Sequence, residues 1–198
     1  MKESESAPKR KIVIFASGNG TNAINIYHYF RDHNGVEVSH VLSNNKKSRV
    51  LRRAHDLKIK CIHFEKEDLY ESNNLLDVLR DINPDIIALA GFLLKIPESI
   101  LTEFPNKIVN IHPSLLPKFG GEGMYGERVF NKILKHKEKE SGITIHYVNQ
   151  NYDEGEIIAQ FKTDLEDNEN LNSLEDKIHA LEYEHYPKVL EKILIDSN

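Results

Sequence analysis

The architecture of this chain is indicated by the stretch Ile12-Val13-Ile14-Phe15-Ala16-Ser17-Gly18-Asn19-Gly20-Thr21-Asn22. Its first four residues form an apolar run without alternation, which predicts a strand buried on both faces. Residues 17–20 predict a tight turn, and Thr21 or Asn22 can cap a helix that we expect to run to about Arg31. A strand, a glycine-rich turn and a helix in this order are typical of the first unit of a doubly wound α/β fold.

Strand-like and helix-like stretches continue to alternate along the chain. After Asn83-Pro84, residues 85–90 are apolar without alternation, as expected for a central strand that is covered on both faces. We predict further strands at 36–42, 60–64 and 108–109, and helices at 50–57 and 68–82.

The C-terminal part of the chain has a different pattern. Residues 143–148 and 156–161 are strand-like and only seven residues apart, which is too close for a crossover helix, so we expect an antiparallel pair. From 171 to 194 apolar residues recur at helical spacing and predict a long closing helix, which Pro187 should kink or interrupt. The sequence therefore predicts one α/β domain over residues 1–198, with a doubly wound, mostly parallel sheet and residues 1–10 as a polar leader.

Composition narrows the possible functions. A formal net charge of -5 and a pI near 6.1 argue against a nucleic-acid groove, although local basic residues could hold a phosphorylated small molecule. No apolar run approaches the ~18 residues of a membrane span and no signal peptide is evident, so we expect a cytoplasmic protein. Cys61, the sole cysteine, should be a small buried hydrophobe, and no Cys/His cluster has the spacing of a metal site.

A second informative stretch is Asn110-Ile111-His112-Pro113-Ser114-Leu115-Leu116-Pro117. In an extended backbone, side chains at i and i+2 leave the same face, so Asn110 and His112 can converge on one substrate atom. An amide that polarises a carbonyl, beside an imidazole that handles a proton, suits acyl chemistry. An isolated pair of this kind is more often a strand end with a hydrogen-bonded histidine.

This stretch closely resembles the signature of the folate-dependent formyltransferases, which move a formyl group from 10-formyltetrahydrofolate to an amine. The resemblance implies a Rossmann-like formyltransferase fold, with Asn110 and His112 as catalytic residues, formyl-folate as a cosubstrate and no tightly bound cofactor or metal. An aspartate in a glycine-containing bend is usually a turn former, but Asp153 matches the acid that pairs with the catalytic histidine. A carboxylate within reach of His112 would raise its pKa and keep it charged.

The glycine-rich turn gains a role from the same resemblance. Free N–H groups at a helix N-terminus favour an anion, but local sequence leaves phosphate binding and a simple tight turn about equally supported. The turn resembles the phosphate loop of the branch that formylates 5'-phosphoribosylglycinamide in purine (IMP) biosynthesis, with Gly20, Thr21 and Asn22 at the phosphate. Glu182 matches an acid on the glycinamide side of the substrate, although on so charged a helix it could simply be solvated.

The binding site for the formyl donor, 10-formyltetrahydrofolate, is expected after the central strand. By resemblance, Leu93, Leu94, Lys95, Ile96 and Asn110 hold the folate, whereas the ordinary interpretation is a strand end packed into the core.

Three other positions stand out in this comparison. His146 could line the site, but a hydrogen-bonded structural role is the more common one. Leu69 stands where relatives carry an arginine, and the glycine-rich loop 119–126 lacks the histidines of some members.

The sequence thus predicts formyl transfer from 10-formyltetrahydrofolate to 5'-phosphoribosylglycinamide, in a monomer or homodimer that binds neither nucleic acid nor membrane. Alternatives within the enzyme class are a formyltransferase for another amine, such as an amino sugar nucleotide, and a formyl-folate hydrolase. An inactive folate-binding module is the alternative from another class. The presence of Asn110, His112 and Asp153 together argues against it, because folate binding alone does not need all three.

Overall fold

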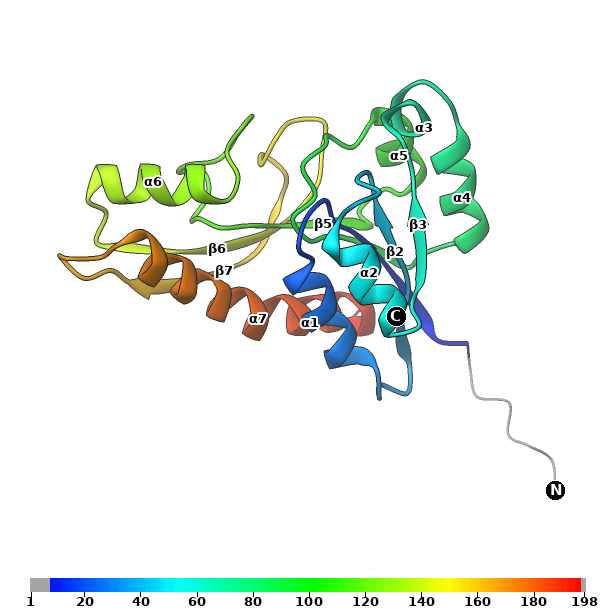
Figure 1. The fold of residues 1–198 in the computed structure, drawn as a ribbon, viewed down its shortest axis with the longest axis horizontal. Coiled ribbons are helices and arrows are strands. Elements are labelled where there is room, and N and C mark those ends of the chain that lie inside the picture. Colours follow the sequence, from blue (N-terminus) through cyan, green and yellow to red (C-terminus); the bar gives the residue numbers. More distant parts are fainter. Residues whose placement is uncertain (1–7, 197–198) are drawn as a thin grey trace.

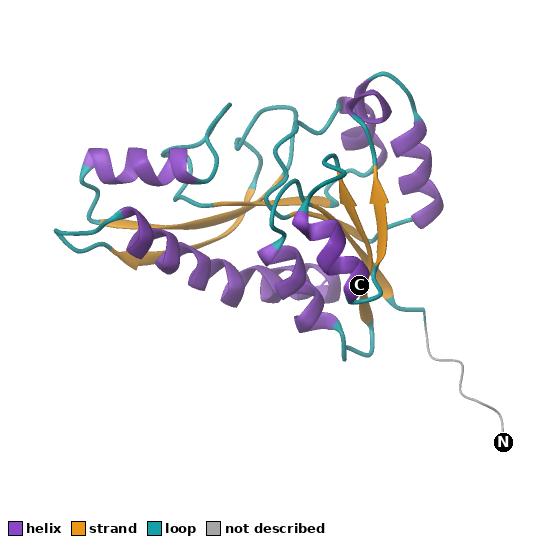
Figure 2. Ribbon diagram, viewed as in Figure 1, coloured by secondary structure: helices purple, strands orange, loops and turns teal. Residues whose placement is uncertain are grey.

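A computed structural model describes residues 8–196, which form one twisted sheet covered by helices (Figures 1 and 2). The sheet has seven strands in the order β3-β2-β1-β4-β5-β6-β7 within these residues. The strands are β1 (Arg10–Phe15), β2 (Val36–Ser43), β3 (Lys60–His63), β4 (Ile86–Leu89), β5 (Ile108–His112), β6 (Glu140–Tyr147) and β7 (Ile157–Asp164). Of the polar leader expected at residues 1–10, residues 1–7 lie outside the described part of the chain.

The sheet is parallel from β3 through β5 and antiparallel from β5 to β7. The predicted doubly wound, mostly parallel sheet is therefore confirmed, as is the antiparallel pair β6–β7. The four residues of β4 are all buried, as their unbroken apolar pattern predicts.

Helices cover both faces of the sheet. The helices are α1 (Thr21–Phe30), α2 (Arg49–Asp56), α3 (Lys66–Tyr70), α4 (Asn74–Ile82), α5 (Glu98–Glu103), α6 (Glu127–His136) and α7 (Leu171–Asp196). Alternate residues of β1 belong to two apolar clusters: Ile12 and Ile14 pack with α1, α2, α6 and α7, whereas Val13 and Phe15 pack with α3, α4 and α5. This period-two alternation is the pleat of a strand that is buried on both faces.

The strand order reverses between β1 and β4, which are neighbours in the sheet but not in the chain. In such sheets, ligands bind beyond the carboxyl ends of the strands at the reversal. Here the loops after β1 and β4 are joined: Ser17 N–H donates to the Gly91 carbonyl at 3.0 Å, and Leu93 N–H donates to Ser17 Oγ at 3.1 Å. The fold thus places the glycine-rich turn beside the segment that carries Leu93.

The expected helix at 68–82 is wrong, because two helices, α3 and α4, occupy this stretch. Asp68 bonds to both sides of the break: it accepts from Glu65 N–H and from Asn74 Nδ2, each at 2.9 Å. Ser72 Oγ also accepts from Asn74 N–H at 3.3 Å. Short polar side chains that bond to nearby backbone compete with helical hydrogen bonds, which explains the interruption.

Pro187 does not interrupt α7, which runs continuously from Leu171 to Asp196. Proline cannot donate to the Tyr183 carbonyl one turn earlier, but Asn25 Nδ2 donates to that carbonyl at 2.9 Å. A side chain of α1 therefore replaces the missing helical bond.

Three smaller expectations also change. The N-cap of α1 is Gly20, with no side-chain cap, rather than Thr21 or Asn22. Helices α5 and α6 lay outside the expected elements, although α6 has apolar side chains at helical spacing in Val129, Phe130 and Ile133. Cys61 is half-buried rather than buried, and burial raises the pKa of its thiol.

None of the helices in residues 8–196 is both long and apolar enough to cross a membrane.

Candidate active site

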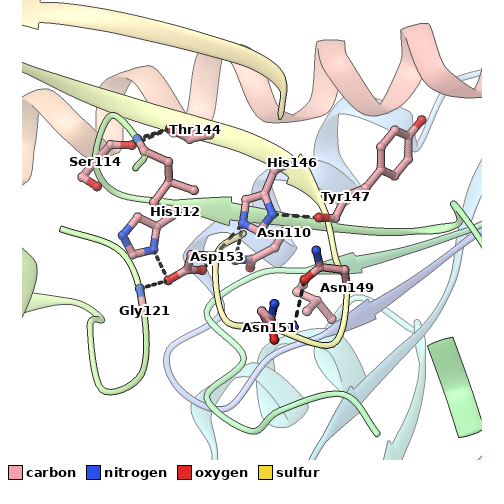
Figure 3. A network of polar contacts seen from close by, with 12 residues as sticks. Asn110, His112, Ser114, Gly121, Thr144, His146, Tyr147, Asn149, Asn151 and Asp153 are labelled. Carbon is pink, nitrogen blue, oxygen red and sulfur yellow. Dashed lines mark hydrogen bonds and ion pairs between the residues drawn. The ribbon is translucent and has the colours of Figure 1, made fainter. Parts of the chain in front are cut away.

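A cavity of about 360 Å³ opens beyond the carboxyl ends of β1, β4 and β5. Its walls come from the loops after these strands, from α7 and from the bend before β7 (Figure 3). All the site residues predicted from the sequence line it, namely Gly20, Thr21, Asn22, Leu93, Leu94, Lys95, Ile96, Asn110, His112, Asp153 and Glu182. The tertiary structure therefore brings together segments that are up to 160 residues apart in the chain.

Asn110 is held by a neighbouring histidine across the β5–β6 pair, where it lies opposite His146. Asn110 Nδ2 lies 3.2 Å from His146 Nε2, and His146 Nδ1 lies 2.9 Å from the Tyr147 carbonyl oxygen. A carbonyl only accepts, so Nδ1 of His146 carries a proton, and Nε2 is the ring nitrogen that faces the Asn110 amide. His146 therefore lines the cavity and orients Asn110, so the purely structural role that we considered more common is too narrow.

His112 is 3% exposed, and an acceptor lies beside each of its ring nitrogens. Nε2 lies 2.9 Å from the Phe119 carbonyl oxygen, and Nδ1 lies 3.5 Å from Asp153 Oδ2 (Figure 3). Burial lowers the pKa of His112 below its ordinary value, although Asp153 and the Phe119 carbonyl act in the opposite sense. Asp153 therefore raises the pKa of His112 as expected, but the larger effect of burial leaves that pKa below its ordinary value.

Asp153 joins three parts of the site. Its Oδ2 accepts from Gly121 N–H at 2.9 Å, and its Oδ1 lies 3.7 Å from His146 Nε2. Burial alone would raise the pKa of Asp153, but His146, His112 and the Gly121 N–H group together bring it below its ordinary value. Asp153 is thus an anion at neutral pH that faces two histidines.

The second half of the Asn110–Pro117 signature is fixed by β6. Thr144 Oγ1 donates to the Ser114 carbonyl at 2.7 Å and accepts from Leu116 N–H at 2.9 Å. These bonds satisfy backbone groups of an irregular segment that leaves β5 after His112. They also hold the exit of β5 in place beside Asn110 and His112.

The glycine-rich turn precedes the N-terminus of α1. The first bond that closes this helix runs from Ile24 N–H to the Gly20 carbonyl at 3.0 Å, so the N–H groups of residues 21–23 have no acceptor within the helix. Gly20 has a left-handed φ of 70°, and a Cβ there would lie 2.2 Å from Val50 Cγ2 of α2. Glycine is therefore required at position 20 by packing, while the open position is Gly18, where a Cβ would meet no atom within 4 Å.

Glu182 is buried, with 7% of its surface exposed, so the solvated alternative is wrong. Its Oε2 accepts from Asn22 Nδ2 at 2.8 Å, which joins α7 to the first turn of α1. Burial raises the pKa of Glu182, and the bond from Asn22 only partly offsets this effect. Asn22 Oδ1 is buried and has no hydrogen-bond partner among the described residues.

In the segment after β4, residues 93–96, some side chains point into the core and others are exposed at the cavity. Ile96 is 3% exposed and packs with the α3, α4 and α5 cluster, whereas Leu93 is 50% exposed. Leu69 of α3 is buried in the same cluster and does not line the cavity.

Sequence reasoning missed two residues of α7. Glu175 and His179 line the cavity, two turns and one turn before Glu182 respectively. Their spacing of four and three residues places all three on one helix face, a signal that was readable from the sequence. Within residues 8–196, no group of three or more His, Cys, Asp and Glu side chains could hold a metal ion.

Comparison with known proteins agrees with this arrangement. Residues 10–190 match the family model described as formyl transferase. The chain is 33% identical to a phosphoribosylglycinamide formyltransferase of Bacillus subtilis (strain 168) over 93% of this chain and 95% of that protein. It is also 31% identical to a protein of the same name from Haemophilus influenzae, over 92% of this chain and 86% of that protein.

Solved structures give the same result. The structure of a phosphoribosylglycinamide formyltransferase from Bacillus halodurans superposes with a TM-score of 0.85 and 31% identity, covering 96% of this chain and 97% of that one. One from Anaplasma phagocytophilum gives 0.85 and 33% identity, covering 95% and 88%.

Proposed function

This chain belongs to the formyl transferase family, and we propose that it transfers the formyl group of 10-formyltetrahydrofolate to the glycinamide amine of 5'-phosphoribosylglycinamide, a step of purine biosynthesis. The observation that carries the proposal is one cavity that contains Asn110, His112 and Asp153 together with the N-terminus of α1. An acyl-transfer site and an anion site in one cavity suit a phosphorylated amine as the acceptor.

In the proposed reaction the acceptor amine attacks the formyl carbon. A C–N bond forms, and the carbonyl electron pair moves to the formyl oxygen, where the Asn110 amide stabilises the developing charge. The amine then loses a proton, the bond from the formyl carbon to N10 of the folate breaks, and N10 gains a proton. The products are the formylated amine and tetrahydrofolate.

The proton is assigned to His112. Since burial lowers its pKa, His112 is largely neutral at neutral pH and can accept the amine proton, directly or through a water molecule. Asp153, at 3.5 Å from Nδ1, then stabilises the imidazolium that forms. His112 later returns the proton to N10, which balances the reaction.

The two substrates are assigned to different parts of the cavity. The acceptor phosphate meets the N–H groups at the start of α1, with Gly20, Thr21 and Asn22, and Glu182 faces its glycinamide side. The donor binds along residues 93–96, beside Asn110. We infer a cytoplasmic single-domain enzyme with formyl-folate as cosubstrate and no tightly bound cofactor, active as a monomer or homodimer without nucleic acid or membrane.

The test is an assay of deformylated folate with three conditions: phosphoribosylglycinamide, an amino sugar nucleotide, or no acceptor. We expect turnover only with phosphoribosylglycinamide, with the formylated amine as product. Turnover with the amino sugar nucleotide would favour the first alternative, and formate release without an acceptor would favour a hydrolase.

A matched pair of variants separates an enzyme from an inactive binding module. His112→Ala should abolish transfer and leave folate affinity within a few fold, because the imidazole acts on charge that develops during the reaction. Asn110→Ala should lose roughly 10²-fold in turnover, the usual effect of removing an oxyanion donor. Wild-type protein that binds folate but transfers no formyl group to any acceptor would contradict the proposal.

A further inference from the structure

We propose that Arg53 of α2 is a positioning residue for the phosphate of the acceptor, because its guanidinium holds the glycine-rich turn in the conformation that presents backbone N–H groups to that phosphate. This inference rests on the proposed function and adds to it a residue that does not itself line the cavity. Three features of the described residues support it: the donors that α2 directs at the turn, the direction of the N–H groups in the turn, and the charge of Arg53.

Helix α2 supplies a donor to each of the two central carbonyls of the turn. Arg53 Nη1 donates to the Asn19 carbonyl oxygen at 3.1 Å, and Val50 N–H donates to the Gly18 carbonyl oxygen, also at 3.1 Å. Figure 1 shows α1 and α2 side by side, so the turn before α1 lies against α2. Residues 18–22 line the cavity, whereas Val50 and Arg53 do not. Both carbonyls therefore point toward α2 instead of into the cavity.

The geometry of the peptide bond then sets the direction of the N–H groups in the turn. In a trans peptide unit, the carbonyl of one residue and the N–H group of the next point in opposite directions. Holding the Gly18 and Asn19 carbonyls against α2 therefore directs the N–H groups of Asn19 and Gly20 away from that helix. Within residues 8–196 neither N–H group has an acceptor, so both are available to an anion, together with the free N–H groups at the start of α1.

Arg53 also places a positive charge beside the turn. Its guanidinium forms no ion pair with any residue that the structure describes. Among the described residues that line the cavity, Lys95 is the only lysine or arginine, and it belongs to the segment assigned to the donor. A cation that bonds to the carbonyl of a peptide unit polarises the N–H group at its other end, which strengthens the bond of that N–H group to an anion.

Arg52 provides a matched control in the same helix. It is exposed, whereas Arg53 is half-buried, and it makes no hydrogen bond with the turn in the described part of the chain. Arg52→Ala and Arg53→Ala remove the same charge from adjacent positions, so the difference between them isolates the bond to the Asn19 carbonyl. Arg53→Lys keeps a charged donor but not the planar guanidinium.

Steady-state kinetics of wild type and the three variants would be measured with phosphoribosylglycinamide and with its dephosphorylated form. We expect Arg53→Ala to raise the KM of the phosphorylated acceptor roughly tenfold, because the turn loses a charged hydrogen bond. Its kcat and its KM for the formyl donor should stay within about twofold of wild type, because the substitution touches no reacting group. Arg53→Lys should recover part of the affinity, and Arg52→Ala should match wild type.

The dephosphorylated acceptor supplies a readout that general damage to the fold would not leave unchanged. Its kcat/KM should be the same in wild type and Arg53→Ala, since it has no phosphate for the turn to bind. Three outcomes would overturn the inference: an unchanged KM in Arg53→Ala, an equal loss for both acceptors, or equal effects of Arg52→Ala and Arg53→Ala.

Calorimetry with ribose 5-phosphate separates this inference from the proposed function, because it needs neither a formyl donor nor an amine. If wild type transfers no formyl group but Arg53→Ala still weakens the binding of ribose 5-phosphate roughly tenfold, the proposed acceptor fails and Arg53 keeps its role. If wild type does not bind ribose 5-phosphate, the phosphate site and this inference fail together.

Discussion

Among the described residues that line the cavity, Asp153 is the only one other than glycine with a left-handed φ, which is 56°. This conformation costs about 1 kcal/mol or more for a residue other than glycine, although aspartate tolerates it better than most. The contacts of the Asp153 carboxylate offset this cost, because it accepts from Gly121 N–H and faces both His112 and His146. A turn-forming residue in sequence terms is thus the electrostatic centre of the site.

Asp153→Asn tests the charge of that residue. The carboxylate raises the pKa of His112 against the effect of burial, so its loss should lower this pKa further. If neutral His112 accepts the proton, the acidic limb of the kcat/KM profile moves to lower pH, and the plateau falls because the imidazolium is less stabilised. The check is an NMR titration of His112 in both proteins together with the pH profile.

Asparagine can still accept from Gly121 N–H, so the bend has no reason to change. An unchanged pKa of His112 would return Asp153 to the role of a turn residue.

Gly20 and Gly18 form a second matched pair at this scale. Gly20→Ala should destabilise the protein by roughly 2–4 kcal/mol, because it combines a left-handed φ with a clash against Val50. Gly18→Ala has open space and should change stability by less than about 0.5 kcal/mol. Urea unfolding of both variants measures the difference, and similar stabilities would contradict the packing argument.

At the scale of secondary-structure elements, α7 connects the end of the cavity that Glu182 lines to the centre of the sheet. Tyr186 is fully buried, and its Oη lies 3.1 Å from the Leu89 carbonyl oxygen and 3.0 Å from that of Val109. Burial raises the pKa of Tyr186 well above its ordinary value, so the hydroxyl keeps its proton and can donate. Leu89 is the last residue of β4, and Val109 immediately precedes Asn110 in β5. The hydroxyl of Tyr186 therefore links α7 to both strands and helps to set the spacing between them.

Removing this hydroxyl should have a measurable cost. Tyr186→Phe should destabilise the fold by about 1–3 kcal/mol, because two buried carbonyls lose a donor. Tyr183→Phe, on the same helix and 37% exposed, should stay within about 0.5 kcal/mol of wild type. Thermal unfolding of the two variants under identical conditions provides the comparison, and an equal loss in both would show that Tyr186 acts only through its ring.

At the scale of the whole molecule, the reversal of strand order between β1 and β4 creates one cavity with two ends. One end is lined by residues of α1 and α7, and the other by the segment after β4. Asn110 is in β5, which lies beside β4 in the sheet, and it lines the same cavity. A transfer reaction needs this geometry, because two substrates must approach one reacting carbon from different sides.

Hydrogen exchange can test this division. Tetrahydrofolate should slow exchange in residues 91–96 and 149–153, whereas phosphoribosylglycinamide should slow it in residues 18–24 and 175–182. The edge strand β7 should serve as an internal control that neither ligand changes. Protection of both ends by either ligand alone would contradict two separate subsites.

Local pattern was sufficient for much of the architecture. Apolar runs without alternation predicted β1 and β4, and the seven-residue spacing after position 148 predicted the antiparallel pair β6–β7. A strand can be recognised from a few consecutive residues, because the pleat fixes which side chains point to each face of the sheet. The proposed catalytic and ligand-binding residues were predicted from the resemblance to a family, and all of them line one cavity in the structure.

The tertiary structure decided everything that depends on contact between distant segments. Asn25 donates to the Tyr183 carbonyl, which Pro187 leaves without a helical donor, and Asn22 donates to Glu182, 160 residues away. Neither pairing can be predicted from local sequence pattern. The same holds for the charge state of His112, since its pKa reflects the balance between burial and a carboxylate 41 residues later, as counted from 112 to 153. Desolvation is a property of the folded interior, so the sequence identified the titratable groups of the candidate site, and only packing determined the direction in which their pKa values shift.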